Sequence, residues 1–109
     1  MDEDPIKRFT RLVLFQAQQD HATELTIAPT SAAGPAIKYK VGDKWYNVSP
    51  PPDHILPDVI AELGRLAAFT KRPFPKEGII EEQFGSLRLH WVVRMESAEA
   101  ACALTAIEP

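Results

Sequence analysis

The feature that most constrains the fold is the segment IKYKVGDKWYNV at residues 37–48. Its first half alternates apolar residues with lysines, which is the period of a half-buried β-strand. Gly42-Asp43 suits a two-residue turn, because glycine at the first central position adopts a positive φ without strain. An aromatic return strand follows the turn. The segment therefore predicts a β-hairpin, so the fold has to contain an antiparallel sheet.

A second and longer alternation covers residues 87–95. One set of its side chains is apolar, and the other set is mostly basic. The apolar set is Leu87, Leu89, Trp91, Val93 and Met95, and the other set is Arg88, His90, Val92 and Arg94. Gly85-Ser86 predicts a turn from a preceding strand around residues 79–81. Shorter strands are predicted in the segments ELTIAP and AACALTAI.

Two amphipathic helices are predicted, the first of them at the start of the chain. Asp4-Pro5 is a good opening for it, since a carboxylate caps the helix and proline fits its first position. The helix is expected to end near Asp20-His21. Its apolar face is assigned to Ile6, Phe9, Leu12, Val13 and Phe15. Leu14 does not fit this stripe, so it is expected to be exposed or to pack against something outside the chain.

The second helix is predicted between the proline run at residues 50–52 and Phe69-Thr70. The prolines are interpreted as a stiff connector that ends the preceding strand. Asp53 is a candidate N-cap, and Pro57 is tolerated in the first turn, where backbone N–H groups lack intrahelical partners. The apolar face is assigned to Leu56, Val59, Ile60, Leu63, Leu66 and Ala67.

These elements predict the fold class. Their order is helix, three strands, helix, three strands, and short turns between strands imply an antiparallel sheet with both helices on one face. The expected class is therefore α+β. With 109 residues, 45% of them hydrophobic, residues 1–109 are expected to form a single domain around one modest core.

Charge and segment composition limit the possible partners and compartments. A formal charge of −3 argues against a dedicated nucleic-acid binder, which usually carries a basic excess. The chain lacks an apolar run of the ~20 residues that cross a bilayer. Its acidic start, MDEDPIKRF, differs from a signal peptide. We expect a cytoplasmic protein that binds no nucleic acid and has no transmembrane segment.

The sequence offers little for catalysis or for cofactors. It has no Walker A loop, and no serine lies in a nucleophile elbow. His21, His54 and His90 fall on separate elements without a second ligand at a metal-binding spacing. Cys102 has no partner for a disulfide and lies among apolar residues, so it is expected to be a buried, inert thiol. The prediction is a protein that is not an enzyme and has neither metal nor cofactor.

Two groups of residues are candidates for binding. Lys38 and Lys40 share one strand face and Arg88 and Arg94 share another, so a common sheet would give a basic patch for an acidic partner, a phosphate or a neighbouring subunit. An ordinary solvated sheet face is the alternative interpretation. The aromatic residues Trp45, Tyr46 and Trp91 are candidates for lining an apolar pocket. The alternative for them is a place in the core.

The order of these segments resembles one known domain. The resemblance is carried by HATELTIAP, IKYKVGDKWYNVSPPP, VIAELGRLAAFTKRPFPKEGII and SLRLHWVV. In order and spacing they are similar to the N-terminal, PAS-like domain of the type II secretion and type IV pilus ATPases. That domain has an Ala-Ser-Asp-x-His strand, an Arg-x-Arg-Val-Asp-Gly hairpin, an Arg-x-Pro-Gln-Asp-Gly-Arg segment and a strand with Asp-x-Arg. The resemblance implies a PAS-like sheet of about six antiparallel strands.

Several family positions differ in this chain. Residues 22–26 read ATELT, so the family histidine is absent, and the hairpin carries Lys38 and Lys40 in place of its two arginines. In the family, the last arginine of Pro-Gln-Asp-Gly-Arg and an arginine on the next strand are expected to reach nucleotide phosphates. Ile79 replaces the first and offers no donor, whereas Arg88 matches the second. The ATPase core with its Walker loop is missing.

The resemblance therefore implies binding without turnover. The expected function is a non-catalytic protein-interaction module, whose partner is a secretion or pilus motor component or further copies of the chain. One alternative is a PAS-like sensor that holds a small molecule. Another is an excised domain of a full-length secretion ATPase, although the altered motif positions favour a free-standing relative.

Overall fold

The computed structural model describes residues 4–107 except 33, 50, 70–72 and 98–99. Its elements are helix α1 (Pro5–Gln19), strands β1 (Glu24–Ile27), β2 (Ile37–Val41) and β3 (Lys44–Val48), the 3-10 turn η1 (Asp53–Ile55), helix α2 (Leu56–Leu66), and strands β4 (Lys76–Phe84), β5 (Leu87–Met95) and β6 (Cys102–Ala106). This is the predicted order of one helix and three strands, twice. The α+β class is confirmed.

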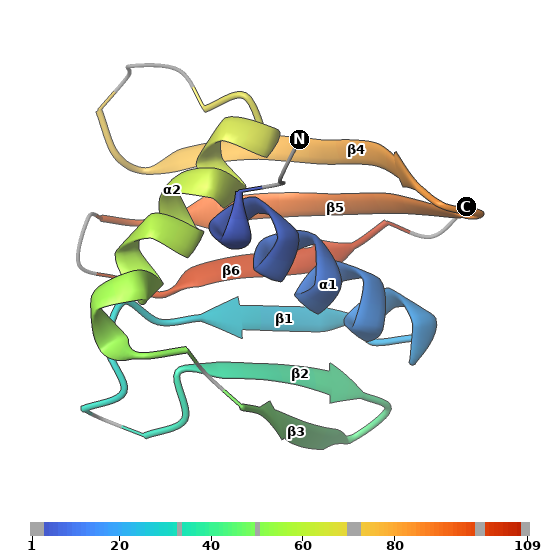
Figure 1. Cartoon of the computed structure of the whole chain (residues 1–109), viewed down its shortest axis with the longest axis horizontal. Coiled ribbons are helices and arrows are strands. Elements are labelled where there is room, and N and C mark those ends of the chain that lie inside the picture. The colour runs from blue at the N-terminus through green and yellow to red at the C-terminus, as the bar shows by residue number, and fades with distance from the viewer. Residues whose placement is uncertain (1–3, 33, 50, 70–72, 98–99, 108–109) are drawn as a thin grey trace.

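The six strands form one antiparallel sheet in the order β3-β2-β1-β6-β5-β4. Strands β1–β3 make one half and β4–β6 the other, and the two halves join where β1 pairs with β6. Both helices lie on the same face of the sheet (Figure 1). The strand order makes β3 and β4 the two edges, and no helix of the described residues covers the opposite face.

Helix α1 begins as predicted. The Asp4 carboxylate accepts a hydrogen bond of 2.8 Å from the backbone N–H of Ile6, Pro5 occupies the first helical turn, and the helix ends at Gln19. Its buried face differs from the prediction, because Leu14 is fully buried whereas Leu12 is 44% exposed. The buried positions are Thr10, Val13, Leu14 and Ala17.

That buried face follows helical geometry. The four positions are spaced three, one and three residues apart, which is one stripe of an α-helix. Thr10 belongs to the stripe because its hydroxyl donates to the carbonyl of Ile6 at 2.7 Å, so burial leaves the hydroxyl satisfied. The predicted face left out Thr10 and Ala17, which share the stripe with Leu14. It was therefore centred on the side of the helix that carries Leu12.

Helix α2 is preceded by a 3-10 turn, and Asp53 does not cap it. The Asp53 carboxylate instead accepts hydrogen bonds from the hydroxyls of Ser31, at 2.7 Å, and Thr30, at 3.2 Å, and these contacts lower its pKa. The N-cap prediction was wrong, because the loop before β2 takes up this carboxylate. The helix ends at Leu66, earlier than predicted, and Thr70 lies outside the described residues.

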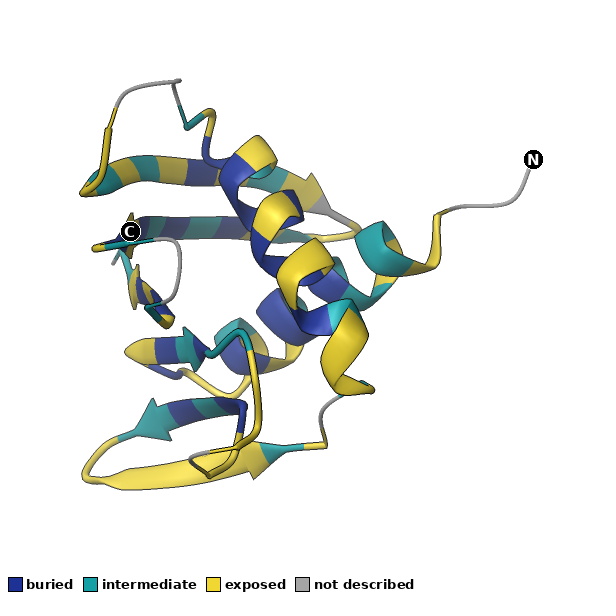
Figure 2. Cartoon of the chain, turned by 90° about the vertical axis from the view of Figure 1, so that its left-hand side faces the viewer, coloured by how far each residue is buried: buried dark blue, intermediate teal, exposed yellow. Residues whose placement is uncertain are grey.

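The core lies between the helices and the sheet. Figure 2 shows buried residues recurring along both helices and along the strands. Its largest fully buried side chains include Trp91, Leu14, Leu25 and Leu63. The helices pack against each other, and α2 and α1 also contact β4 and β5, respectively. Trp91, a candidate pocket residue with the core as the alternative, is fully buried on β5, which α1 contacts, and so belongs to the core.

One close approach fixes α2 against β4. A Cβ atom added to Gly78 would overlap the backbone carbonyl oxygen of Ala67, at the C-terminal end of the helix. Any side chain at position 78 would push the helix end away from the strand. The glycine of the segment Pro75–Ile79 therefore has a packing reason in this fold.

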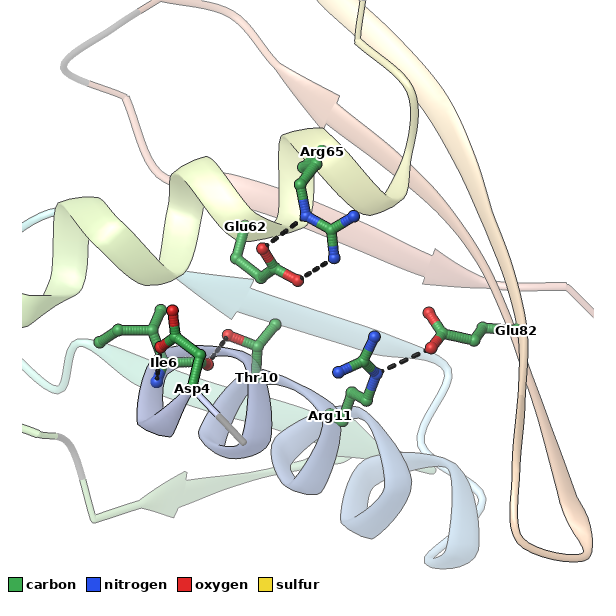
Figure 3. A network of polar contacts seen from close by, with 7 residues as sticks. All are labelled: Asp4, Ile6, Thr10, Arg11, Glu62, Arg65 and Glu82. Atoms are coloured by element: carbon green, nitrogen blue, oxygen red, sulfur yellow. Dashed lines mark hydrogen bonds and ion pairs between the residues drawn. The ribbon is translucent and has the colours of Figure 1, made fainter. Parts of the chain in front are cut away.

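Polar contacts also tie the helix layer together (Figure 3). Glu62 is only 7% exposed and receives two hydrogen bonds from Arg65, at 2.8 and 2.5 Å. These bonds lower the pKa of Glu62 despite its burial, which acts in the opposite direction. Arg11 of α1 contacts Glu82 of β4 at 2.7 Å. The Arg11–Glu82 contact thus connects α1 to β4, whereas the Glu62–Arg65 pair lies within α2.

Within the part of the chain that the structure describes, neither helix has the length and apolar character needed to span a membrane.

Candidate interaction surface

The face of the sheet opposite the helices collects the predicted basic residues. Strand register places Lys38 opposite Thr26, Thr26 opposite Ala103, and Ala103 opposite Arg94. Directly paired residues point to the same side of a sheet, so this row shares one face. Lys40 and Arg88 lie on that face too, because each is two or six residues from a member of the row. The structure brings the four cations to one surface.

Each of these cations has a close partner. Lys40 lies 3.7 Å from Glu24, Arg88 lies 2.6 Å from Glu81, and Arg94 contacts Glu96 at 2.7 Å and Glu77 at 3.4 Å. The Nζ atom of Lys38 lies 5.2 Å from the ring centroid of Trp45. The two carboxylates beside Arg94, Glu96 first, raise its pKa further. The surface is therefore a mixed-charge sheet face and not a continuous basic patch.

The three aromatic candidates do not share a pocket. Trp91 is fully buried beneath the helices, whereas Trp45 is 42% exposed on the opposite face of the sheet. Tyr46 lies on the helix-facing side of β3 and is 46% exposed. Trp45 and Tyr46 are consecutive strand residues, which face opposite sides, and three strands separate β3 from β5, the strand of Trp91. Strand alternation alone excludes a cavity lined by all three.

Strand β3 is the least covered element of the sheet. Its first four residues are exposed and Val48 is half-buried, as the exposed colouring along the strand in Figure 2 shows. A groove of about 430 Å³ runs beside it, lined by Phe9, Leu12, Val13 and Gln16 of α1 and by residues 47–49. An edge strand with two exposed aromatic side chains and an adjoining groove of mixed polarity is a typical site of strand addition.

The neighbouring strand β2 is held more firmly. The Tyr39 hydroxyl donates a 2.6 Å hydrogen bond to the carboxylate of Asp20, at the end of α1. This bond, together with burial, raises the pKa of Tyr39. The ring of Tyr39 also lies 6.0 Å from that of Tyr46. Strand β2 is thus held against the end of α1, and β3 pairs with it.

Sequence reasoning treated β3 as an ordinary return strand and did not predict that it is an exposed edge of the sheet. The signal was present, because KWYNV lacks the apolar–polar alternation of β2 and β5 and places its two aromatics on opposite faces. A strand with one buried face would concentrate its apolar residues on that face.

The cysteine and His90 have ordinary structural surroundings. Cys102 is free and buried, as predicted, and burial raises the pKa of its thiol to about 12. His90 lies 3.3 Å from Glu81 on the mixed-charge face. Among the described residues, no cluster of three or more histidine, cysteine or carboxylate side chains is arranged to hold a metal ion.

No protein-family model matches the chain, and no curated protein matches it significantly.

Proposed function

We propose that this chain is a non-catalytic protein-interaction module, related to the N-terminal domain of type II secretion and type IV pilus ATPases, and that it binds its partner through the edge strand β3. The partner is a component of a secretion or pilus motor or a further copy of the chain. The proposal places the module in the cytoplasm.

The observation that carries the proposal is the exposed edge. Strand β3 ends the sheet, and Trp45 and Tyr46 leave more than two fifths of their surface in solvent on its two faces. Large aromatic side chains are enriched at protein interfaces, because each one buries a large area with little loss of conformational freedom. The groove beside Leu12 extends this apolar surface onto α1.

Support for the kinship comes from the chain path. The resemblance implies two helices on one face of a six-stranded antiparallel sheet, and the elements follow that order. Gly78, which occupies a motif position of the family, is required by the contact between α2 and β4. A retained fold without a Walker loop is what a module that binds and does not hydrolyse nucleotide would have.

Site-specific photo-cross-linking in cells tests the binding edge. A benzoylphenylalanine placed at Trp45 should give an adduct whose second component, identified by mass spectrometry, is a motor protein or the chain itself. The same cross-linker at Ala61, an exposed position of α2, is the matched control. Equal adducts from both positions, or none from position 45, would contradict the proposal. ATP hydrolysis by the purified chain above the buffer rate would contradict its non-catalytic part.

A further inference from the structure

We infer that the partner of the β3 edge is a second copy of this chain, with the two β3 strands pairing antiparallel about a two-fold axis at Tyr46. The inference rests on the proposed use of this edge and specifies its occupant. It would join two six-stranded sheets into one continuous sheet of twice that size.

The edge is open to pairing. Residues 44–48 contain no proline, carry a single charge at Lys44, and pair one-to-one with β2, so there is no bulge. Charges, prolines and bulges are the usual devices that keep edge strands apart. The opposite edge does use charge, because β4 contains Lys76, Glu77, Glu81 and Glu82. Self-pairing is therefore expected at β3 and not at β4.

The backbone groups of β3 that face away from β2 fit this geometry. A two-residue loop makes its flanking residues, Val41 and Lys44, a hydrogen-bonded pair, and such pairs alternate along a hairpin. Tyr46 is then hydrogen-bonded to β2, whereas Trp45 and Asn47 direct their N–H and C=O groups outward. Those outward groups are the ones that a further strand would bind.

One register uses both of these residues. When Tyr46 lies on the axis, Trp45 of each copy is opposite Asn47 of the other, and the two pairs form four backbone hydrogen bonds. Centring on Trp45 or Asn47 forms only two within the strand. The register also places Lys44 opposite Val48, so no like charges meet. An isologous interface needs a self-complementary patch, and β3 meets this requirement.

The side chains gain cover in the same arrangement. The two Tyr46 rings face each other across the axis as a closely spaced, non-hydrogen-bonded pair. An axis perpendicular to the sheet keeps both helix layers on one side, so Leu12 and the groove of each copy flank the new strand pair. A five-residue strand pair buries less than a standard interface of roughly 1,600 Å². The dimer is therefore expected to be weak and dependent on concentration.

Sedimentation velocity over a concentration series of the purified chain tests the inference. The mass should rise from 12.1 kDa toward twice that value as concentration increases. Tyr46→Lys and Tyr46→Glu each place like charges on the axis and should weaken dimerisation at least tenfold. Mixing the two variants places opposite charges there and should restore the dimer, which a surface other than this two-fold contact would not do.

Two further variants separate pairing from folding. Asn47→Pro removes an outward N–H group that β2 does not use, so it should abolish the dimer with little change in the urea unfolding midpoint. Ile79→Lys, which adds a charge at an exposed apolar residue of the other edge, should leave the dimer unchanged. A wild-type chain that stays monomeric, or a Tyr46→Lys variant that dimerises normally, overturns the inference. A cross-link from position 45 to a different motor protein would then preserve the proposed function alone.

Discussion

The two hairpins of this protein begin from the same chemistry and end in different environments. Residues 37–48 and residues 76–95 both form antiparallel pairs around a two-residue turn, with a φ of 61° at Gly42 and 64° at Gly85. The second hairpin has nine residues in each strand, and α2 and α1 pack on it. The first has five residues in each strand, and its outer strand is exposed.

This difference shows what alternation does and does not specify. The period-2 pattern and the turn glycine fix strand pairing, because both are properties of a few neighbouring residues. Whether a face meets a helix or solvent depends on how far the helix layer extends across the sheet. Here the helix layer packs on the β4 side, at Gly78 and through the Arg11–Glu82 contact, and the β3 edge stays exposed.

The largest expected effect compares the two tryptophans. Trp91→Ala should lower the free energy of unfolding by about 3–5 kcal/mol, because it leaves a large cavity in the core. Trp45→Ala should change it by less than about 1 kcal/mol, because Trp45 lies half in solvent. Urea unfolding of the monomer at low concentration measures both. Equal losses would mean that β3 is as well packed as β5.

A milder variant protects this comparison if Trp91→Ala fails to fold. Among the described residues, the indole N–H of Trp91 has no hydrogen-bond partner. Trp91→Phe removes this unsatisfied donor, which offsets part of the lost packing, so we expect a loss of only about 1–2 kcal/mol. A loss as large as that expected for alanine would show that the donor is satisfied.

The second comparison concerns two glycines. Gly78→Ala should destabilise the protein by about 1–3 kcal/mol, since its methyl group meets the rigid backbone of Ala67. Gly42→Ala has open space around it and only a positive φ to maintain, so a loss of about 1 kcal/mol is expected. The unfolding midpoint in urea ranks the two. A larger loss of stability for Gly42→Ala would show that the positive φ of the turn matters more than the close contact at Gly78.

Much of the fold could be predicted because its signals are local. The turns at Gly42 and Gly85, the opening of α1 at Asp4 and the order of the elements all depend on short segments. One error arose where a distant contact decided the outcome, and another where a polar residue took part in a buried helical stripe. Asp53 turned to Ser31, 22 residues away, and Leu14 was buried by a stripe that includes a threonine.

The candidate site was predicted less well. The register confirms that Lys38 and Arg94 share a face, but one of the two carboxylates that neutralise Arg94, Glu77, lies on another strand. Predicting which strand forms the exposed edge requires the order of the strands in the sheet. The sequence indicates it only through the missing alternation in β3. Sheet order depends on non-local pairing, whereas hairpins depend on adjacent residues.

The third prediction tests the helix layer through pH. Glu62→Gln should lower the free energy of unfolding at neutral pH by about 1–2 kcal/mol, because it removes charge-assisted bonds to Arg65. The pKa of Glu62 is lowered from an ordinary value of 4.5, so its stabilisation is complete above that value and is lost as the pH falls through the lowered pKa. The difference between wild type and variant should therefore shrink on acidification.

Unfolding curves from neutral pH to below pH 4 measure this difference. Asp58→Asn, an exposed position on the same helix, is the control and should change stability by less than about 0.5 kcal/mol. A difference that grows as the pH falls would reverse the sign of the pKa argument and remove Glu62 from the contacts that stabilise the helix layer.

The smallest expected effect concerns the mixed-charge face, where the two halves of the molecule are alike. Glu81→Gln removes the partner of Arg88 in the β4–β5 half, and Glu24→Gln removes that of Lys40 in the β1–β2 half. Exposed ion pairs contribute about 0–1 kcal/mol, so both losses should be small and should fall further at high salt. Similar losses of stability in the two variants would mean that the two halves of the sheet differ in their packing only on the helix-facing side. A much larger loss for Glu24→Gln would show that the outer face also stabilises the β3 half, and the edge would then be less free to exchange its contacts for those of a second copy.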